Sequence, residues 1–105
     1  MRVFKIIARK TLLEYCKTYP KAANAITEWY HELINRDFTS FQELKKAYGN
    51  ASLVGDDRVV FNIGANKYRL VVRIVFVYRV IQINWFGTHQ EYNKVDVKKV
   101  KYLKR

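Results

Sequence analysis

The chain has 105 residues, half of them apolar and 15% aromatic, which is enough for one hydrophobic core and excludes intrinsic disorder. Lys and Arg outnumber Asp and Glu by 20 to 9, and the net charge of +11 favours an anionic partner, nucleic acid before a membrane surface. One cysteine and two histidines exclude an intramolecular disulfide and a zinc cluster, and no apolar run approaches the about 20 residues that span a bilayer. We therefore expect one domain, residues 1–105, in a reducing cytoplasm.

The first half of the chain predicts one strand and three helices. Residues 2–8 have the composition of a strand, and residues 11–14, Thr-Leu-Leu-Glu, form a capping-box pattern that predicts the start of a first helix. Pro20 suits the first position of a second helix, whose apolar residues recur at spacings of three and four. Residues 40–43, Ser-Phe-Gln-Glu, are a second capping box before a short third helix that ends near Gly49.

The second half predicts an antiparallel sheet. After a short strand at residues 51–54, residues 58–92 contain three consecutive strands that end in a short polar segment. Residues 64–66, Gly-Ala-Asn, suit a tight hairpin between the first two of these strands. In the middle strand, residues 67–76, one face is apolar and the other carries a lysine and two arginines. The fold class is therefore α+β, with an N-terminal strand and two to three helices packed on a mainly antiparallel sheet.

Basic and polar side chains gather on one face of this predicted sheet. Keeping the apolar residues of neighbouring strands on the other face determines a register, which pairs Arg58 with Arg73, Asn62 with Arg69, Ile63 with Tyr68, Gln82 with Arg73, Asn84 with Val71 and Phe86 with Arg69. In this register Trp85 belongs to the core, and the polar cluster consists of Arg58, Asn62, Lys67, Arg69, Arg73, Gln82, Phe86 and His89. Like charges side by side destabilise a sheet, so such a cluster is typical of an anion-binding surface. A solvated basic face without a ligand is the alternative.

Two sequence blocks are specific enough to indicate a family: NKYRLVV at residues 66–72 and GTHQEY at residues 87–92. Together with the order of elements, they resemble the HigB-type toxins of bacterial toxin–antitoxin systems, which belong to the RelE/ParE superfamily. The resemblance covers nearly the whole chain but not the basic tail at residues 98–105, to which we assign no role. It implies a RelE-like fold and an mRNA interferase that typically acts on translating ribosomes. It also implies a partner, a cognate antitoxin of the HigA type, usually a helix-turn-helix protein.

The residues suggest how such a protein cleaves RNA. Without a carboxylate cluster nothing holds a catalytic Mg²⁺, so we expect no metal or cofactor. A metal-free ribonuclease uses the 2′-hydroxyl of its substrate as the nucleophile on the adjacent phosphate, and needs a base, an acid and cations. Histidine titrates near neutral pH without perturbation, and one helical turn would bring Tyr92 to the same side as His89. The expected catalytic residues are His89, Tyr92, Lys67, Arg69 and Arg73. The expected RNA-binding residues are Arg58, Asn62, Lys67, Arg69, Gln82, Phe86 and Lys94, with Phe86 or Tyr92 stacking on a base.

Two other functions stay open. ParE-like relatives share the fold but poison DNA gyrase, which would leave the basic sheet face and His89 unexplained. A non-catalytic module that binds RNA or the ribosome would explain the charge but not the pairing of His89 with Tyr92. Three further residues are expected outside the site: Cys16 packs in the core, Glu91 is a solvated carboxylate, and Arg79 leaves the basic face by strand alternation.

Overall fold

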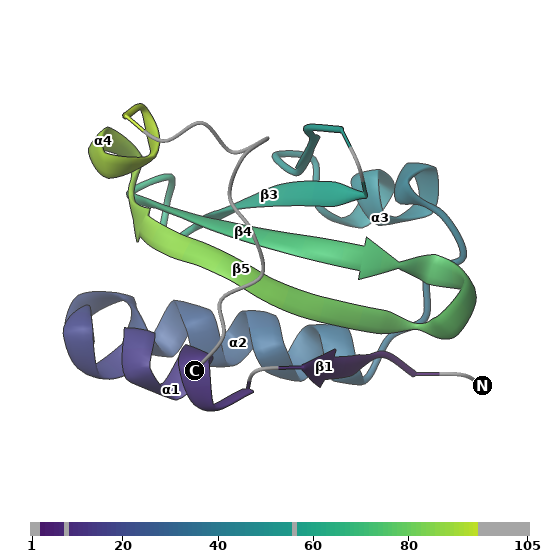
Figure 1. Ribbon diagram of the computed structural model, residues 1–105, viewed down its shortest axis with the longest axis horizontal. Coiled ribbons are helices and arrows are strands. Elements are labelled where there is room, and N and C mark those ends of the chain that lie inside the picture. The colour runs from purple at the N-terminus through teal and green to yellow at the C-terminus, as the bar shows by residue number, and fades with distance from the viewer. Residues whose placement is uncertain (1–2, 8, 56, 95–105) are drawn as a thin grey trace.

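The computed structural model describes residues 3–7, 9–55 and 57–94 and has its two longest helices on one side of a five-stranded sheet (Figure 1). The elements are β1 (Lys5–Ile7), α1 (Arg9–Thr18), η1 (Pro20–Ala22), α2 (Ala23–Ile34), α3 (Phe41–Ala47), β2 (Ser52–Leu53), β3 (Arg58–Ile63), β4 (Tyr68–Val75), η2 (Phe76–Tyr78), β5 (Val80–Thr88) and α4 (His89–Tyr92). The strand order is β1-β5-β4-β3-β2; β1 pairs parallel with β5, and all other pairs are antiparallel. The predicted α+β class is confirmed, and the predicted basic tail at 98–105 lies outside the described residues.

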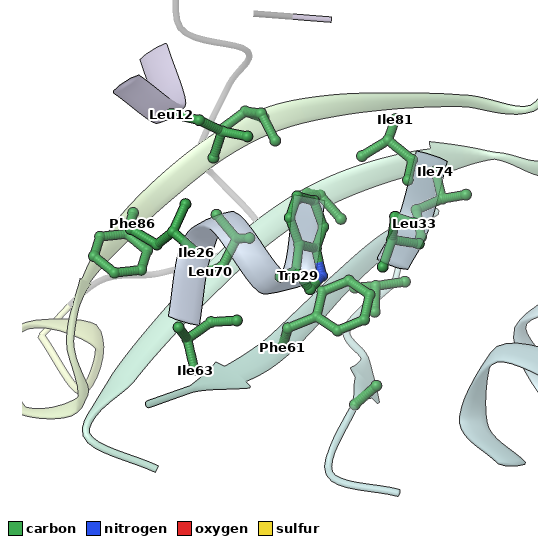
Figure 2. Close-up of a cluster of buried hydrophobic side chains, with 14 of the residues drawn as sticks. Leu12, Ile26, Trp29, Leu33, Phe61, Ile63, Leu70, Ile74, Ile81 and Phe86 are labelled. Carbon is green, nitrogen blue, oxygen red and sulfur yellow. The ribbon is translucent and has the colours of Figure 1, made fainter. Parts of the chain in front are cut away.

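The hydrophobic core lies between α2 and the sheet (Figure 2). Ile26, Trp29 and Leu33 recur at helical spacing along α2, and each is at most 3% exposed. They pack on buried strand residues that include Phe61, Ile63, Leu70, Ile74 and Ile81. Burial of each such aliphatic or aromatic side chain contributes about 1.5–3 kcal/mol, so this layer dominates the stability of the fold. In the described part of the chain, no helix is long and apolar enough to cross a membrane.

The helix starts follow the predicted signals at two of three positions. Ser40 caps α3 as expected, because its side chain accepts a hydrogen bond from the Glu43 backbone N–H at 3.3 Å. Pro20 opens η1, which continues directly into α2. The capping role predicted for Thr11 is wrong: α1 begins at Arg9, and Thr11 is buried inside its first turn. The helix therefore begins three residues before Leu12, the first helical position that the capping-box pattern indicates.

The β3–β4 register agrees with the prediction, and the β4–β5 register agrees only in part. Arg58 pairs with Arg73, Asn62 with Arg69 and Ile63 with Tyr68, as expected. On β5, Gln82 pairs with Arg73, again as expected. The ladder then shifts between Val71 and Val72: Ile83 opposes Val72 but Trp85 opposes Val71, so Asn84 is an extra residue in a β-bulge. The predicted pairs of Asn84 with Val71 and of Phe86 with Arg69 are therefore wrong.

The bulge exchanges the faces of two aromatic residues, because one extra residue moves every following side chain to the opposite face. Phe86, predicted on the basic face, opposes Leu70 and is buried at 4% exposure. Its ring stacks on Tyr15 and Tyr68, with centroid distances of 5.3 and 5.5 Å. Trp85, predicted in the core, is half-buried on the other face.

This exchange predicts unequal effects of two aromatic truncations. We expect Phe86→Ala to lower the free energy of unfolding by about 3–5 kcal/mol, because it leaves a cavity between α1 and the sheet. Trp85→Ala should lower it by no more than about 2 kcal/mol, because the side chain is half-buried and its removal leaves no enclosed cavity. Urea unfolding followed by circular dichroism measures both. A larger loss for Trp85→Ala would show that β5 continues without a bulge.

Candidate functional site

The sheet face opposite α1 and α2, here called the basic face, is built from three rows of residues that run across β3, β4 and β5. The rows follow from the strand register and are Arg58–Arg73–Gln82, Val60–Val71–Trp85 and Asn62–Arg69–Gly87. Val60 and Val71 are buried and form an apolar middle row, whereas the outer rows are polar or basic. Neighbouring rows are about 6.6 Å apart, since each is two residues further along a strand.

The arginines of the basic face differ in how firmly they are held. Arg69 Nη1 donates to the carbonyl oxygens of Asn66 and Tyr68 at 2.8 and 3.1 Å, which ties its guanidinium to the β3–β4 hairpin. Arg73 Nη2 lies 4.0 Å from a carboxylate oxygen of Asp57, and both side chains are largely exposed. Such a surface ion pair contributes little, so the Arg73 guanidinium can exchange Asp57 for another anion.

A short helix continues from the end of β5 and carries the predicted histidine and tyrosine. Thr88 caps α4: its side chain accepts from the Glu91 backbone N–H at 3.1 Å, and the Glu91 carboxylate accepts from the Thr88 N–H at 2.8 Å. His89 N–H also donates to the Lys67 carbonyl at 3.1 Å, so the helix begins beside the β3–β4 hairpin (Figure 1). The predicted helical turn from His89 to Tyr92 is confirmed.

Trp85 joins this site although the sequence analysis assigned it to the core. Its ring lies 6.1 Å from that of Tyr92, centroid to centroid. Gly87 makes this possible, because a Cβ there would lie 2.7 Å from Trp85 Cη2 and 2.9 Å from Glu91 Oε1. The only sequence signal was the break in alternation, two adjacent aromatic residues followed by a glycine. Strict alternation made Trp85 the apparent core residue and Phe86 the apparent surface residue.

The structure gathers some of the predicted site residues and separates others. Lys67, Arg69, His89 and Tyr92 lie at the α4 end of the basic face, and exposed Lys94 is the second residue after α4. The other basic row, with Arg58, Arg73 and Gln82, is at the opposite end, about 13 Å away along β4. Phe86 is not part of the site, because its side chain is buried in the core.

Arg79 and Cys16 lie away from the basic face, as expected, whereas Glu91 belongs to α4 and is more than a solvated carboxylate. Arg79 is buried and donates to the Asp37 carboxylate and the Phe76 carbonyl, and Cys16 packs against the core, where burial raises the pKa of its thiol. Glu91 is exposed, but the Thr88 backbone N–H and then the Tyr19 hydroxyl lower its pKa by hydrogen bonding. Among the described residues, no group of His, Cys, Asp and Glu side chains could hold a metal ion.

Replacing Gly87 should loosen this end of the site. Gly87→Ala forces the Trp85 indole or the Glu91 carboxylate to move, and we expect a loss of about 1–3 kcal/mol in the free energy of unfolding. Gly49→Ala is the matched control, because a Cβ at Gly49 would meet nothing within 4 Å. Urea unfolding compares the two variants. Equal stabilities of Gly87→Ala and the wild type would contradict the packing of Trp85 over Gly87.

Comparison with known proteins places this architecture in a family. A family model described as the HigB toxin, the RelE-like toxic component of a toxin–antitoxin system, matches residues 22–95, which include β2 to β5, the basic face and α4. The chain is also 26% identical over 92 residues to the mRNA interferase HigB of Escherichia coli O6:H1, an alignment that covers 86% of this chain and 89% of that protein. The chain therefore belongs to the HigB toxin family, the RelE-like toxic components of toxin–antitoxin systems.

Proposed function

We propose that this toxin is a metal-independent endoribonuclease that cleaves mRNA on translating ribosomes. One observation supports the proposal most strongly: α4 begins beside Lys67, at the end of a sheet face that is rich in arginine. His89, Tyr92, Lys67 and Arg69 thus come from adjoining segments of the backbone, which supports a common phosphate site at this end of the sheet. The name of the E. coli relative, an mRNA interferase, agrees with this chemistry.

The basic face suits a single RNA strand. Its outer rows are about 13 Å apart, with the apolar row between them, so the arginines can contact separate phosphates of one strand. Arg58, Arg73 and Gln82 would hold the strand at the end far from α4, and Asn62 would contact it beside Arg69 at the α4 end. Trp85 and Tyr92 provide aromatic surfaces on which bases can stack, the role first expected of Phe86. Lys94 adds a charge beyond α4.

The proposed reaction is an internal transfer at phosphorus. The 2′-oxygen of one nucleotide bonds to the adjacent phosphorus, the bond to the 5′-oxygen of the next nucleotide breaks, and one proton moves from the 2′-hydroxyl to that leaving oxygen. The products are a 2′,3′-cyclic phosphate and a 5′-hydroxyl. His89 and Tyr92 transfer the protons, while Lys67 and Arg69 stabilise the extra negative charge of the transition state.

Charge also suggests how the partner controls the toxin. The family implies a cognate antitoxin, which we propose to be a helix-turn-helix protein of the HigA type. Residues 58–105 contain eleven Lys or Arg against two Asp or Glu, a net charge of +9. An acidic antitoxin segment that covers the basic face would prevent this half from binding RNA non-specifically in the cytoplasm.

Replacing the histidine should separate binding from chemistry. His89→Gln keeps the polarity and approximate size of the side chain but cannot transfer a proton near pH 7. We expect RNA binding to stay within about threefold of the wild type and cleavage of ribosome-bound mRNA to fall by roughly 10²–10⁴, the usual contribution of a positioned acid or base. Binding by fluorescence anisotropy and single-turnover cleavage measure the two quantities. Full activity in His89→Gln would remove His89 from the mechanism.

Lys67→Ala is the contrasting variant, because Lys67 contributes charge. It should weaken binding to all RNA sequences and reduce the slope of log K against log salt by roughly 0.7.

Toxin induction in cells, together with these binding and cleavage assays, distinguishes the two alternative functions. Intact mRNA with accumulating DNA breaks after toxin induction would indicate a gyrase poison, and tight RNA binding without cleavage would indicate a non-catalytic module.

A further inference from the structure

A single hydrogen bond connects the end of α1 to α4 across 72 residues of sequence. The Tyr19 hydroxyl, one residue beyond α1, donates to Glu91 Oε1 at 3.0 Å. We propose that Tyr19 and Glu91 are positioning residues that hold α4 in place, so that His89 and Tyr92 face the RNA. This inference rests on the proposed ribonuclease function, but it concerns two residues that the proposed chemistry does not use.

Tyr19 is a rigid anchor for this contact. Its backbone N–H donates to the Tyr15 carbonyl at 2.8 Å, and Pro20 restricts the backbone directly after it. Its ring packs edge-on against Phe86 and Tyr68, with centroid distances of 5.3 and 5.9 Å. The Tyr19 ring is therefore held by the aromatic part of the core around Phe86, which the bulge places there.

The protonation states of both groups favour this hydrogen bond at neutral pH. Burial raises the pKa of Tyr19 above its ordinary value, and the Glu91 carboxylate raises it further, so the phenol remains a donor. Hydrogen bonds from the Thr88 backbone and from Tyr19 lower the pKa of Glu91, so the carboxylate remains an ionised acceptor. A hydrogen bond to a charged acceptor is stronger than a neutral one.

The helix needs such a support because it is only four residues long. An isolated turn of this length does not form in water, since helix nucleation is unfavourable. The capping box attaches α4 to β5, and the bond from the His89 N–H to the Lys67 carbonyl attaches its first residue to the β3–β4 hairpin. Glu91 ties the turn to Tyr19, and the Tyr92 ring lies 6.1 Å from that of Trp85 on the basic face, centroid to centroid. Held by both contacts, α4 leaves His89 exposed at its first position.

The geometry also distinguishes a positioning role for Glu91 from a chemical one. Its Oε1 atom already accepts two hydrogen bonds, from Thr88 N–H and from the Tyr19 hydroxyl. Glutamine can accept the same two bonds through its amide oxygen but cannot take up a proton as a base. Alanine can do neither. Glu91→Gln should therefore retain activity that Glu91→Ala loses.

The test is steady-state cleavage of ribosome-bound mRNA by folded variants. We expect Tyr19→Phe and Glu91→Ala to lower kcat roughly tenfold with KM within about twofold, because a displaced α4 misaligns the reacting groups without removing binding charge. Glu91→Gln should stay within about threefold of the wild type. Combining Tyr19→Phe with Glu91→Ala should lower kcat no further than Glu91→Ala alone, since both remove the same contact.

Tyr48→Phe is the matched control. The Tyr48 hydroxyl also donates to a glutamate, Glu32 Oε1 at 2.5 Å, but this bond joins the end of α3 to α2 and does not involve α4. Its kcat should equal that of the wild type within about twofold. An unchanged kcat in Tyr19→Phe would overturn the inference. Glu91→Gln as inactive as Glu91→Ala would also overturn it, because Glu91 would then act in proton transfer.

A second measurement tests the positioning role without any RNA, and therefore does not depend on the proposed function. The imidazole resonances of His89 in an NMR spectrum report the position of α4 without any substrate. We expect them to shift in Tyr19→Phe and to stay unchanged in Tyr48→Phe. A wild-type protein that cleaves no RNA would end the ribonuclease proposal, whereas unchanged His89 resonances in Tyr19→Phe would end the positioning role.

Discussion

The extra residue in β5 determines both the core and the site of this toxin. Without Asn84 in the bulge, Phe86 would lie beside Arg69 on the basic face and Trp85 would be buried. With it, Phe86 completes an aromatic cluster with residues of α1 and β4, while Trp85 lies near Tyr92. Bulges are common next to active sites, where they direct side chains that regular alternation would place elsewhere. Here the bulge places Phe86 against Tyr19, which donates to Glu91 of α4, and places Trp85 near Tyr92 of α4.

The arrangement divides stability and activity between different parts of the molecule. The layer between α2 and the sheet buries large apolar side chains and provides most of the folding free energy. The basic face, with an arginine opposite an arginine on β3 and β4, is unfavourable for the sheet on its own. A ligand that brings negative charge relieves this repulsion, which is consistent with RNA or an acidic antitoxin segment as alternative occupants.

Much of this architecture could be predicted, because alternation and turn chemistry act locally. The β3–β4 hairpin, its register and the face that carries Arg69 and Arg73 all follow from period-two patterning and the turn at residues 64–66. The bulge could not be predicted from alternation, because both Trp85 and Phe86 are large and apolar and either one satisfies the pattern. The cap of α4 could have been predicted, since Thr88 and Glu91 have capping-box spacing, but the sequence analysis treated Glu91 only as a solvated carboxylate. The contact of Glu91 with Tyr19 could not be predicted, because it depends on tertiary packing.

The central claim is that the 2′-hydroxyl of the RNA is the nucleophile, and the most direct measurement replaces that group. An mRNA with a single 2′-deoxynucleotide at a mapped cleavage position is loaded on ribosomes and treated with the toxin. We expect cleavage at that position to disappear, while unmodified mRNA yields 2′,3′-cyclic phosphate and 5′-hydroxyl ends. Undiminished cleavage at the 2′-deoxy position would show that another nucleophile attacks the phosphate, and would contradict this account of the site.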